Sequence, residues 1–249
     1  MSLIRDQAVV LRRLDYSETS QVLALMTRNH GKVRAIAKGI KRSTRARFAV
    51  GVDLLEVGDL VLSVRPAGQS AEGGLATLTE WRQARSFWGL RQRLSRLYAA
   101  QYATEVTAGL TADWDPHLGL YDALLGLLES LCRLEDTLPE VVGFLARLLE
   151  EVGSAPRWDR CVSCQRPARA GPGLYFSSFE GGLLCRDCEG TYQEKRQVPA
   201  GVLPLLRGAA ESGPARWAAA FDLLNYHVSH LMGRAPLLAD KLVASRCHR

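Results

Sequence analysis

The chain has 249 residues, of which 47% are hydrophobic, and its 32 Lys+Arg against 26 Asp+Glu give a formal net charge of +6. This length suits one large domain or a few small ones, and the apolar fraction permits a substantial core. The basic balance favours an acidic partner. Neither a run of about 18 apolar residues nor a secretory signal is visible, so we expect a soluble, cytoplasmic protein.

The first 80 residues contain short apolar segments that predict strands rather than helices. In the segment 32–38, Val33, Ala35 and Ala37 alternate with more polar residues, so they share one face of a strand. Five such segments in about 80 residues favour a small β-barrel of the OB type, with a β-sandwich as the alternative. The expected strands are 8–11, 21–27, 32–38, 60–64 and 75–80.

The segment from Thr19 to Val52 contains basic residues and no Asp or Glu. On a small barrel, this composition is typical of a groove that neutralises a phosphate backbone, although a solvated basic face would have the same composition. Two further basic residues follow the second cysteine pair, and ordinary surface charge also explains them. The candidate DNA-binding residues are Lys32, Arg34, Lys38, Lys41, Arg42, Arg45 and Arg47, with Lys195 and Arg196 as an extension.

From Arg82 onward, apolar residues recur every three or four positions, which predicts helices. Asp115-Pro116 is typical of a helix start and opens a second helix to Leu134. Thr137 and Glu140 have the spacing of a capping box, which predicts a third helix to about Val152. Beyond the cysteines we expect helices over 199–211 and 214–232, followed by a basic tail over 236–249.

Two CxxC pairs lie twenty residues apart, a spacing typical of a four-thiolate zinc site. Glycines and short apolar runs between them predict a hairpin of the zinc-ribbon kind. Two disulfides or four unrelated cysteines are the alternatives. An all-cysteine ligand set indicates a closed, structural site, so we expect one structural Zn²⁺ per chain. The predicted ligands are Cys161, Cys164, Cys185 and Cys188.

The fold class that follows is a multidomain α+β protein. An N-terminal OB-fold β-barrel is expected over residues 1–80. An α-helical bundle domain is expected over 81–157 and 197–249, interrupted by an inserted four-cysteine zinc-ribbon-like module over 158–196.

Familiar catalytic motifs, including GxxxxGK[ST], HExxH and GxSxG, are missing from the sequence, so we expect no enzymatic activity. Asp53, Glu56 and Asp59 cluster in the sequence and could bind Mg²⁺ for nuclease chemistry, but they are typical of a solvated loop. His227 and His230 are three residues apart on a predicted helix without a carboxylate beside them, which argues against a second metal site.

The opening Val10 to Ser20 and the run Gly31 to Gly39, taken with the cysteine pairs, resemble the bacterial recombination mediator family RecO over the whole chain. The resemblance implies an OB-fold domain, a helical domain and a zinc module, with the four cysteines above as ligands. The resemblance also implies, less specifically, a DNA-binding role for these residues: Lys32, Arg34, Lys38, Lys41 and Arg42.

The same resemblance implies a function in DNA repair without catalysis. It implies binding of single- and double-stranded DNA, annealing of complementary strands, and help in loading RecA, together with RecR, on DNA coated by single-strand-binding protein. The expected location is the cytoplasm, at the nucleoid. A zinc-ribbon transcription factor and a metal-dependent nuclease are the alternatives. For the acidic tail of single-strand-binding protein, we expect an apolar cleft edged by arginine, with these candidates: Arg82, Arg85, Arg93 and Arg96.

Overall fold

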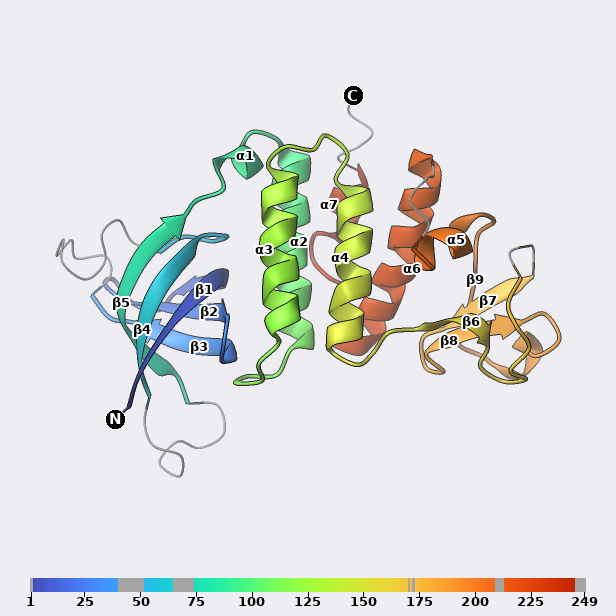
Figure 1. Ribbon diagram of the computed structural model, residues 1–249, viewed down its shortest axis with the longest axis horizontal. Coiled ribbons are helices and arrows are strands. Elements are labelled where there is room, and N and C mark those ends of the chain that lie inside the picture. The colour runs from blue at the N-terminus through green and yellow to red at the C-terminus, as the bar shows by residue number, and fades with distance from the viewer. Residues whose placement is uncertain are drawn as a thin grey trace. The chain divides into compact units, whose positions relative to one another are not determined.

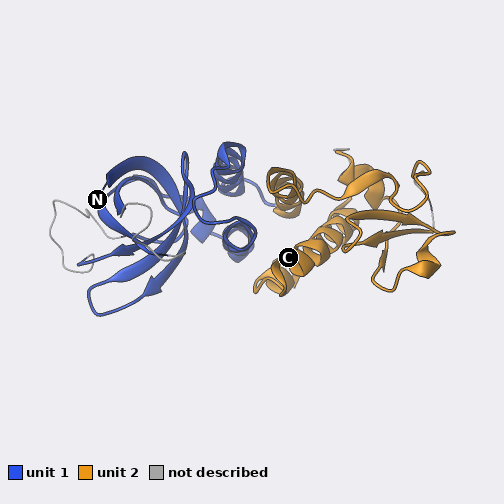
Figure 2. Ribbon diagram, turned by 90° about the horizontal axis from the view of Figure 1, so that it is seen from below, with its two compact units in different colours: residues 1–135 blue, residues 136–249 orange. Residues whose placement is uncertain are grey.

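The structure is a computed structural model that describes residues 2–39, 52–64, 74–169, 171, 173–208 and 213–244. The chain divides into two compact units, residues 1–135 and 136–249, which Figure 2 shows in different colours. Within the described ranges, no helix is long and apolar enough to cross a membrane.

Five strands of unit 1 hydrogen-bond to one another in a closed order, β1-β2-β3-β5-β4, with β4 pairing back to β1. The pairing of β3 with β5 is parallel, and the other four pairings are antiparallel. The strands, labelled in Figure 1, are β1 (Ser2–Asp15), β2 (Gln21–Thr27), β3 (Gly31–Ala37), β4 (Val57–Val64) and β5 (Ala76–Arg85).

The interior of this sheet is apolar because alternate side chains of each strand point inward. Val33, Ala35 and Ala37 on β3 are completely buried, which confirms the alternation predicted for that segment. Leu23 and Leu25 on β2 are buried beside them. The side chains of β3 that alternate with Val33, Ala35 and Ala37 therefore lie on the outer face of the sheet.

The helix predicted to begin at Arg82 does not begin there. Strand β5 continues to Arg85, where Arg82 pairs with Asp59 and Arg85 pairs with Val57 across β4. Pairing with a long neighbouring strand overrides the helical spacing, because hydrogen bonds to β4 satisfy the backbone of these residues. The helices of unit 1 are α1 (Trp88–Arg91), α2 (Leu94–Leu110) and α3 (Leu118–Leu131).

Arg96 on α2, one of the arginines expected to edge an apolar cleft, is instead buried and bonded to the backbone. The residue is only 7% exposed. Its guanidinium donates to the backbone carbonyls of Cys132, Arg133 and Leu134 beyond α3, and to that of Gly89. The last carbonyls of a helix lack partners within the helix, and a cation there also complements the helix dipole. Arg96 therefore joins α1, α2 and the end of α3.

The closed sheet is held against the linker between α2 and α3. The amide of Trp114 donates to the carbonyl of Lys32 at 2.8 Å. The hydroxyl of Tyr121 on α3 donates to the side-chain oxygen of Gln7 at 3.1 Å. Gly31 lies so close to the linker that a Cβ atom there would be 1.9 Å from the carbonyl oxygen of Asp115. The contacts of Lys32 and Gly31 fix the start of β3 beside the linker, and the bond between Tyr121 and Gln7 joins α3 to β1.

Unit 2 combines helices with a small four-stranded sheet of order β6-β8-β7-β9. The helix over 214–232 begins and ends where the sequence predicted. The segment 239–244, expected to belong to a basic tail, is helical instead, and the helix expected over 199–211 is shorter. The elements are α4 (Leu138–Glu151), β6 (Arg157–Cys161), β7 (Leu174–Ser177), β8 (Gly182–Cys185), the short 3-10 helix η1 (Glu189–Thr191), β9 (Arg196–Gln197), α5 (Val202–Leu206), α6 (Pro214–Met232) and α7 (Ala239–Ala244).

The predicted capping box at the start of α4 is not formed. Thr137 is buried and its side chain makes no capping hydrogen bond. The carboxylate of Asp136 instead accepts a hydrogen bond from the amide of Leu138 at 3.3 Å. The boundary between the compact units, at residue 135, groups α1–α3 with the closed sheet and α4–α7 with the small sheet. The three-domain division itself stays a prediction.

The contact at Gly31 yields a first test of the fold. Gly31 and Gly39 both have positive φ, +69° and +72°, but a Cβ on Gly39 would meet nothing within 4 Å. We expect Gly39→Ala to lower the free energy of unfolding by about 1 kcal/mol, the cost of the left-handed conformation. Gly31→Ala should cost at least about 2 kcal/mol more, because the linker must move. Denaturant unfolding measures both, and equal losses would contradict the tight packing of β3 against the linker.

Candidate functional site

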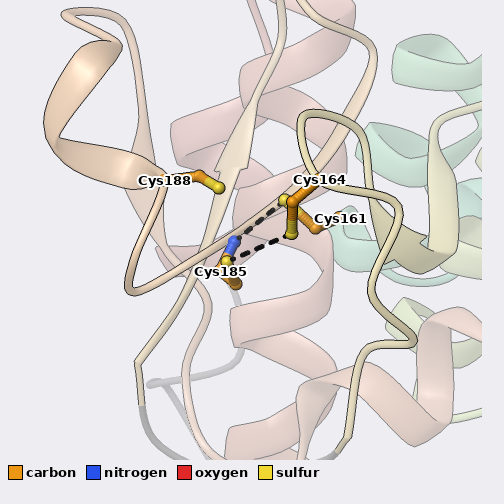
Figure 3. Close-up of side chains that lie close together, drawn as sticks. All are labelled: Cys161, Cys164, Cys185 and Cys188. Carbon is orange, nitrogen blue, oxygen red and sulfur yellow. Dashed lines mark hydrogen bonds between the residues drawn. The ribbon is translucent and has the colours of Figure 1, made fainter.

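The four predicted ligand cysteines come together in unit 2, as Figure 3 shows. All four sulfur atoms lie within 4.8 Å of one another. The Sγ atoms of Cys164 and Cys185 are 3.8 Å apart. Four sulfurs at about 2.3 Å from a tetrahedral metal would be about 3.8 Å from one another. The cluster could therefore hold one metal ion with little rearrangement.

The backbone places these thiols in two tight turns. Cys161 ends β6, and its carbonyl accepts a hydrogen bond from the amide of Gln165 at 3.0 Å. Cys185 ends β8, and its carbonyl accepts one from the amide of Cys188 at 3.0 Å. A further bond, from the amide of Val162 to the carbonyl of Leu183, connects the first turn to β8 at 2.8 Å. The predicted hairpin between the pairs is present as β7 and β8.

The surroundings of Cys161 favour its thiolate form. Burial would raise the pKa of this thiol, but hydrogen bonds from the backbone amides of Cys164, Cys185 and Ser163 outweigh burial and lower the pKa to about 7. The amide of Cys185 lies 3.4 Å from the Cys161 sulfur. None of the described cysteines is in a disulfide. A hydrogen bond from Ser163 would lower the pKa of the Cys188 thiol, but burial and the neighbouring cysteines outweigh it and raise that pKa to about 11. The convergence of four sulfurs at metal-binding separations, and not the thiol pKa values, therefore favours a metal centre over the disulfide alternative.

Glu194 holds the turn between β7 and β8 onto α6. Its carboxylate accepts hydrogen bonds from the hydroxyl of Ser177 at 2.7 Å and from the amides of Ser178 and Phe179 at 3.1 Å each. It also accepts a short hydrogen bond from the hydroxyl of Tyr226 on α6. Burial would raise the pKa of the Glu194 carboxyl, but these donors outweigh it and hold the pKa below its usual value of 4.5.

His227 on α6 is a second support of the same turn and not a metal ligand. Its Nε2 donates to the carbonyl of Ser154 at 3.0 Å, so its Nδ1 accepts from the hydroxyl of Ser178 at 2.8 Å. The imidazole is buried, and burial lowers its pKa, which favours this neutral form. His230 instead lies edge-on against Phe179 and Tyr226.

Lys195 and Arg196, the two basic residues predicted to extend the DNA surface, make contacts inside unit 2. The ammonium of Lys195 donates to the carbonyl of Glu189 at 2.6 Å and forms an ion pair with the Glu189 carboxylate. The guanidinium of Arg196 lies over the ring of Tyr226, 4.2 Å from its centre. Both side chains therefore stabilise the small sheet, and their role toward DNA stays a prediction.

Of the candidate residues on β3, Lys32 is the most enclosed. Its ammonium donates to the carbonyls of Ala108 at 2.7 Å and Thr111 at 2.5 Å, at the C-terminal end of α2. It also lies 3.4 Å from the carboxylate of Asp113. Lys32 thus complements the negative end of the helix dipole. It would have to give up these bonds to reach a phosphate.

Arg34 and Lys38 are exposed on the outer side of the closed sheet. The guanidinium of Arg34 donates to Asp113 at 2.6 Å, although 47% of its side chain is still exposed. Lys38 is the first residue after β3, two positions after Ile36 in the sequence. The remaining four candidates, in the loop after β3, lie outside the described residues: Lys41, Arg42, Arg45 and Arg47.

The three acids considered for Mg²⁺ are ion-paired or hydrogen-bonded separately. Asp53 pairs with Arg13 at 2.9 Å and with Arg91 at 2.6 Å. Asp59 pairs with Arg82 at 2.6 Å. Glu56 accepts a hydrogen bond from the backbone amide of Asp53 at 3.1 Å. In the described part of the chain, the cysteines are the only group of metal-ligating residues that comes together. The geometry therefore gives no support to a magnesium-dependent nuclease.

Three of the arginines expected to border a cleft also have acidic partners. Arg82 pairs with Asp59 as above, Arg85 forms an ion pair with Glu129, and Arg93 pairs with Glu135 at 2.9 Å. Sequence reasoning missed Asp113, Glu194 and the role of His227. Asp113 is 79 residues from Arg34 along the chain, so no local pattern could have connected the two.

Comparison with known proteins places this geometry in a family. A model described as Recombination protein O N terminal matches residues 1–87, and one described as Recombination protein O C terminal matches residues 91–240. A relative from Rhodopirellula baltica, "DNA repair protein RecO", is 32% identical over 204 residues, which are 82% of this chain and 73% of the relative.

Two further relatives with the same printed name cover the chain as widely. The protein from Anaeromyxobacter dehalogenans strain 2CP-C is 32% identical over 244 residues, 94% of this chain and 93% of the relative. The protein from Rubrobacter xylanophilus is 34% identical over 212 residues, 84% of this chain and 82% of the relative. The similarity therefore extends over both compact units.

The contacts of Glu194 predict a pH-dependent stability. A carboxyl whose folded pKa is lowered stabilises the fold above its unfolded pKa, and that contribution is lost as the pH falls through the folded pKa. We expect Glu194→Gln to lower the free energy of unfolding by about 1–3 kcal/mol near neutral pH. The difference in free energy of unfolding between Glu194→Gln and the unchanged protein should become smaller below about pH 4.5, the usual pKa of a glutamate carboxyl. Chemical unfolding across this pH range measures it.

The control for that measurement is Glu180→Gln, which removes the same charge from an exposed residue of the same turn. It should change the free energy of unfolding by less than about 0.5 kcal/mol at every pH. A loss for Glu194→Gln that is equally large in acid and at neutral pH would show that the carboxylate charge is not what holds the turn.

Proposed function

Since this chain belongs to the RecO family of DNA repair proteins, we propose that it is a recombination mediator that acts without catalysis. In this proposal it binds single- and double-stranded DNA and anneals complementary strands. With RecR, it also helps to load RecA on DNA coated by single-strand-binding protein. Its place of action would be the cytoplasm, at the nucleoid.

The observation that carries the DNA-binding part is the closed sheet of unit 1 with cations on its outer face. We interpret the order β1-β2-β3-β5-β4, with β3 parallel to β5, as an OB fold. In such folds the β2–β3 face and the adjoining loops bind oligonucleotides. Here that face carries Arg34, followed by Lys38 and a basic loop. These groups would neutralise phosphates without reading a sequence.

Annealing would follow from the same charges. Two strands repel each other through their phosphates, and a basic surface that binds both of them lowers this repulsion and holds the bases close together. No nucleotide hydrolysis is needed for such a step. We propose Lys38, Arg34 and the loop after β3 as the main contacts: Lys41, Arg42, Arg45 and Arg47. Lys32, Lys195 and Arg196 would contribute charge from within their present contacts.

We propose that the cysteine cluster binds one Zn²⁺ with a structural role. The observed sulfur separations fit a tetrahedral ion, and four thiolates leave no position for a reacting water. When bound, the ion would supply only charge neutralisation and cross-linking of the two turns. The ligands would be Cys161 and Cys164 from the first turn, and Cys185 and Cys188 from the second.

For the acidic tail of single-strand-binding protein, we propose a hollow in unit 2 in place of the arginines near α2. This hollow of about 450 Å³ lies among residues of α4, α5 and α6. Val142, Leu149 and Trp217 are among its apolar lining, and Arg207 also lines it while its guanidinium donates to the backbone carbonyls of Trp158 and Ala168. Such a hollow suits a short apolar segment with an acidic end.

The zinc proposal predicts one equivalent of Zn²⁺ per chain in freshly purified, reduced protein. Cys185→Ser should lose the ion and destabilise unit 2, because a neutral hydroxyl cannot replace a thiolate. Cys132→Ser is the control, since Cys132 lies outside the cluster, in unit 1. Elemental analysis and thermal unfolding measure the two effects. Zinc-free protein of full stability would end the proposal.

The contact between Arg34 and Asp113 predicts a gain of affinity. Asp113 holds the guanidinium that a phosphate would bind, so Asp113→Asn should strengthen DNA binding by up to about fivefold, the value of an exposed ion pair. The slope of log affinity against log salt should steepen by a little under one unit, because the Asp113 carboxylate no longer competes with a phosphate for Arg34. Fluorescence anisotropy with a labelled oligonucleotide over a range of salt concentrations measures both quantities.

Asp115→Asn is the matched control for this test. It removes the same charge from the same linker, where Asp115 lies beside His117 and not beside a cation of β3. An equal gain from both variants would mean that only net charge matters. A loss of affinity in Asp113→Asn would mean that the carboxylate positions Arg34 for DNA.

A further inference from the structure

The outer face of the closed sheet carries a row of apolar side chains that phosphate binding does not require. The strand register places Leu14 on β1 opposite Val22 on β2, and Val22 opposite Ile36 on β3. Leu14 is 56% exposed, and Val22 and Ile36 are half-buried. Their chain neighbours Leu23 and Ala35 are completely buried on the inner side. The row therefore lies on the surface and outside the core.

Cations and an aromatic ring border this row. The adjacent row, Arg12 opposite Ala24 opposite Arg34, is on one side of it. On the other side, Tyr16 follows the end of β1 and is 69% exposed. Its amide donates to the carbonyl of Ser20 at 3.0 Å, which fixes its position at the start of the turn. We call this surface the outer row: Arg12, Leu14, Tyr16, Val22, Ile36 and Lys38.

Few acids in the described part of the chain accompany the outer row. The carboxylate of Asp15 accepts a hydrogen bond at 3.0 Å from the side-chain Nε2 of Gln21, and Gln21 is itself only 7% exposed. Glu18 is exposed in the turn after Tyr16, and Asp113 pairs with Arg34 at the edge of β3. The surface therefore combines positive charge with apolar and aromatic area.

This combination differs from what duplex DNA requires. A duplex presents phosphates outward and keeps its bases stacked, so cations alone suffice to hold it. A single strand also has free base faces, and these gain free energy by stacking on aromatic side chains beside a basic groove. An apolar row with cations on one side and an aromatic ring on the other suits bases that lie against the sheet with their phosphates toward the cations.

We infer that the outer row binds the unpaired bases of single-stranded DNA, and that Tyr16 stacks on one of them. The inference rests on the proposed function, because it assumes that the chain binds DNA through this sheet. It adds to that function a preference: Tyr16 and Leu14 contribute to binding of a single strand and not to binding of a duplex. An apolar segment of another protein is the competing occupant, and the experiment separates the two.

The test measures affinity for three probes of equal length at one salt concentration: a single strand, a strand of the same phosphates with abasic sites, and a duplex. Tyr16→Ala should weaken binding of the single strand by about fivefold to about 150-fold, the range for loss of one base–aromatic stack. Its affinity for the abasic strand and the duplex should change by less than about twofold. Tyr16→Phe should keep the affinity of the unchanged protein.

Two further variants make the test specific. Leu14→Ala should weaken binding of the single strand but not of the abasic strand. Phe179→Ala is the matched control, because this ring is 77% exposed but belongs to the other compact unit, and it should change none of the affinities. Thermal unfolding should be the same for all variants, since both Tyr16 and Leu14 are largely exposed.

The outcomes are distinguishable. If the unchanged protein binds the strand but Tyr16→Ala binds all three probes as well as before, no base stacks on Tyr16 and the inference is overturned, while the proposed function stands. Equal weakening on all three probes also overturns it, because the bases would then be irrelevant. If the unchanged protein binds none of the probes, the proposed function itself fails.

Discussion

Closure of the five-stranded sheet is the constraint on which the account of unit 1 depends. Once β4 pairs back to β1, the inner side of every strand faces a common interior, and that interior is filled mainly by apolar side chains. Charged residues that alternate with Val33 and Ala35 on β3 therefore have no place but the outer side. The positive face is a consequence of this closure, and the linker acid Asp113 limits how much of it is free.

In unit 2, polar contacts provide stability that a larger apolar core would otherwise provide. The small sheet is joined to α6 through the carboxylate of Glu194 and the buried imidazole of His227. The four cysteines come together at the ends of β6 and β8. A sheet of short strands has too little apolar area to be stable alone, so an ion at the cysteines would provide much of the missing stability. Lys195 and Arg196 belong to this structural framework.

Local patterns explain which parts were predictable from the sequence. The alternation of apolar and polar residues predicted strand β3, and the helical spacing of apolar residues predicted helix α6. The spacing of the two CxxC pairs predicted the cysteine cluster. Two of the failures share a cause, which is a partner distant in the chain. Strand β5 continues past Glu80 because β4 is beside it, and Arg96 is buried because α3 ends beside it. No local signal marks Asp113 as the partner of Arg34.

The central claim is that cations on the outer face of the closed sheet and in the sequence directly after β3, and not overall charge, bind DNA. Salt-titrated binding of Lys38, Lys41 and Arg42 replaced together by Ala tests it most directly. The control removes three exposed arginines of unit 2: Arg157, Arg216 and Arg234. If about four to six cations meet phosphates, the slope for a single strand should be about −3 to −4. The first triple should reduce that slope by about two units and the control should leave it unchanged. Equal effects of both triples would contradict the claim.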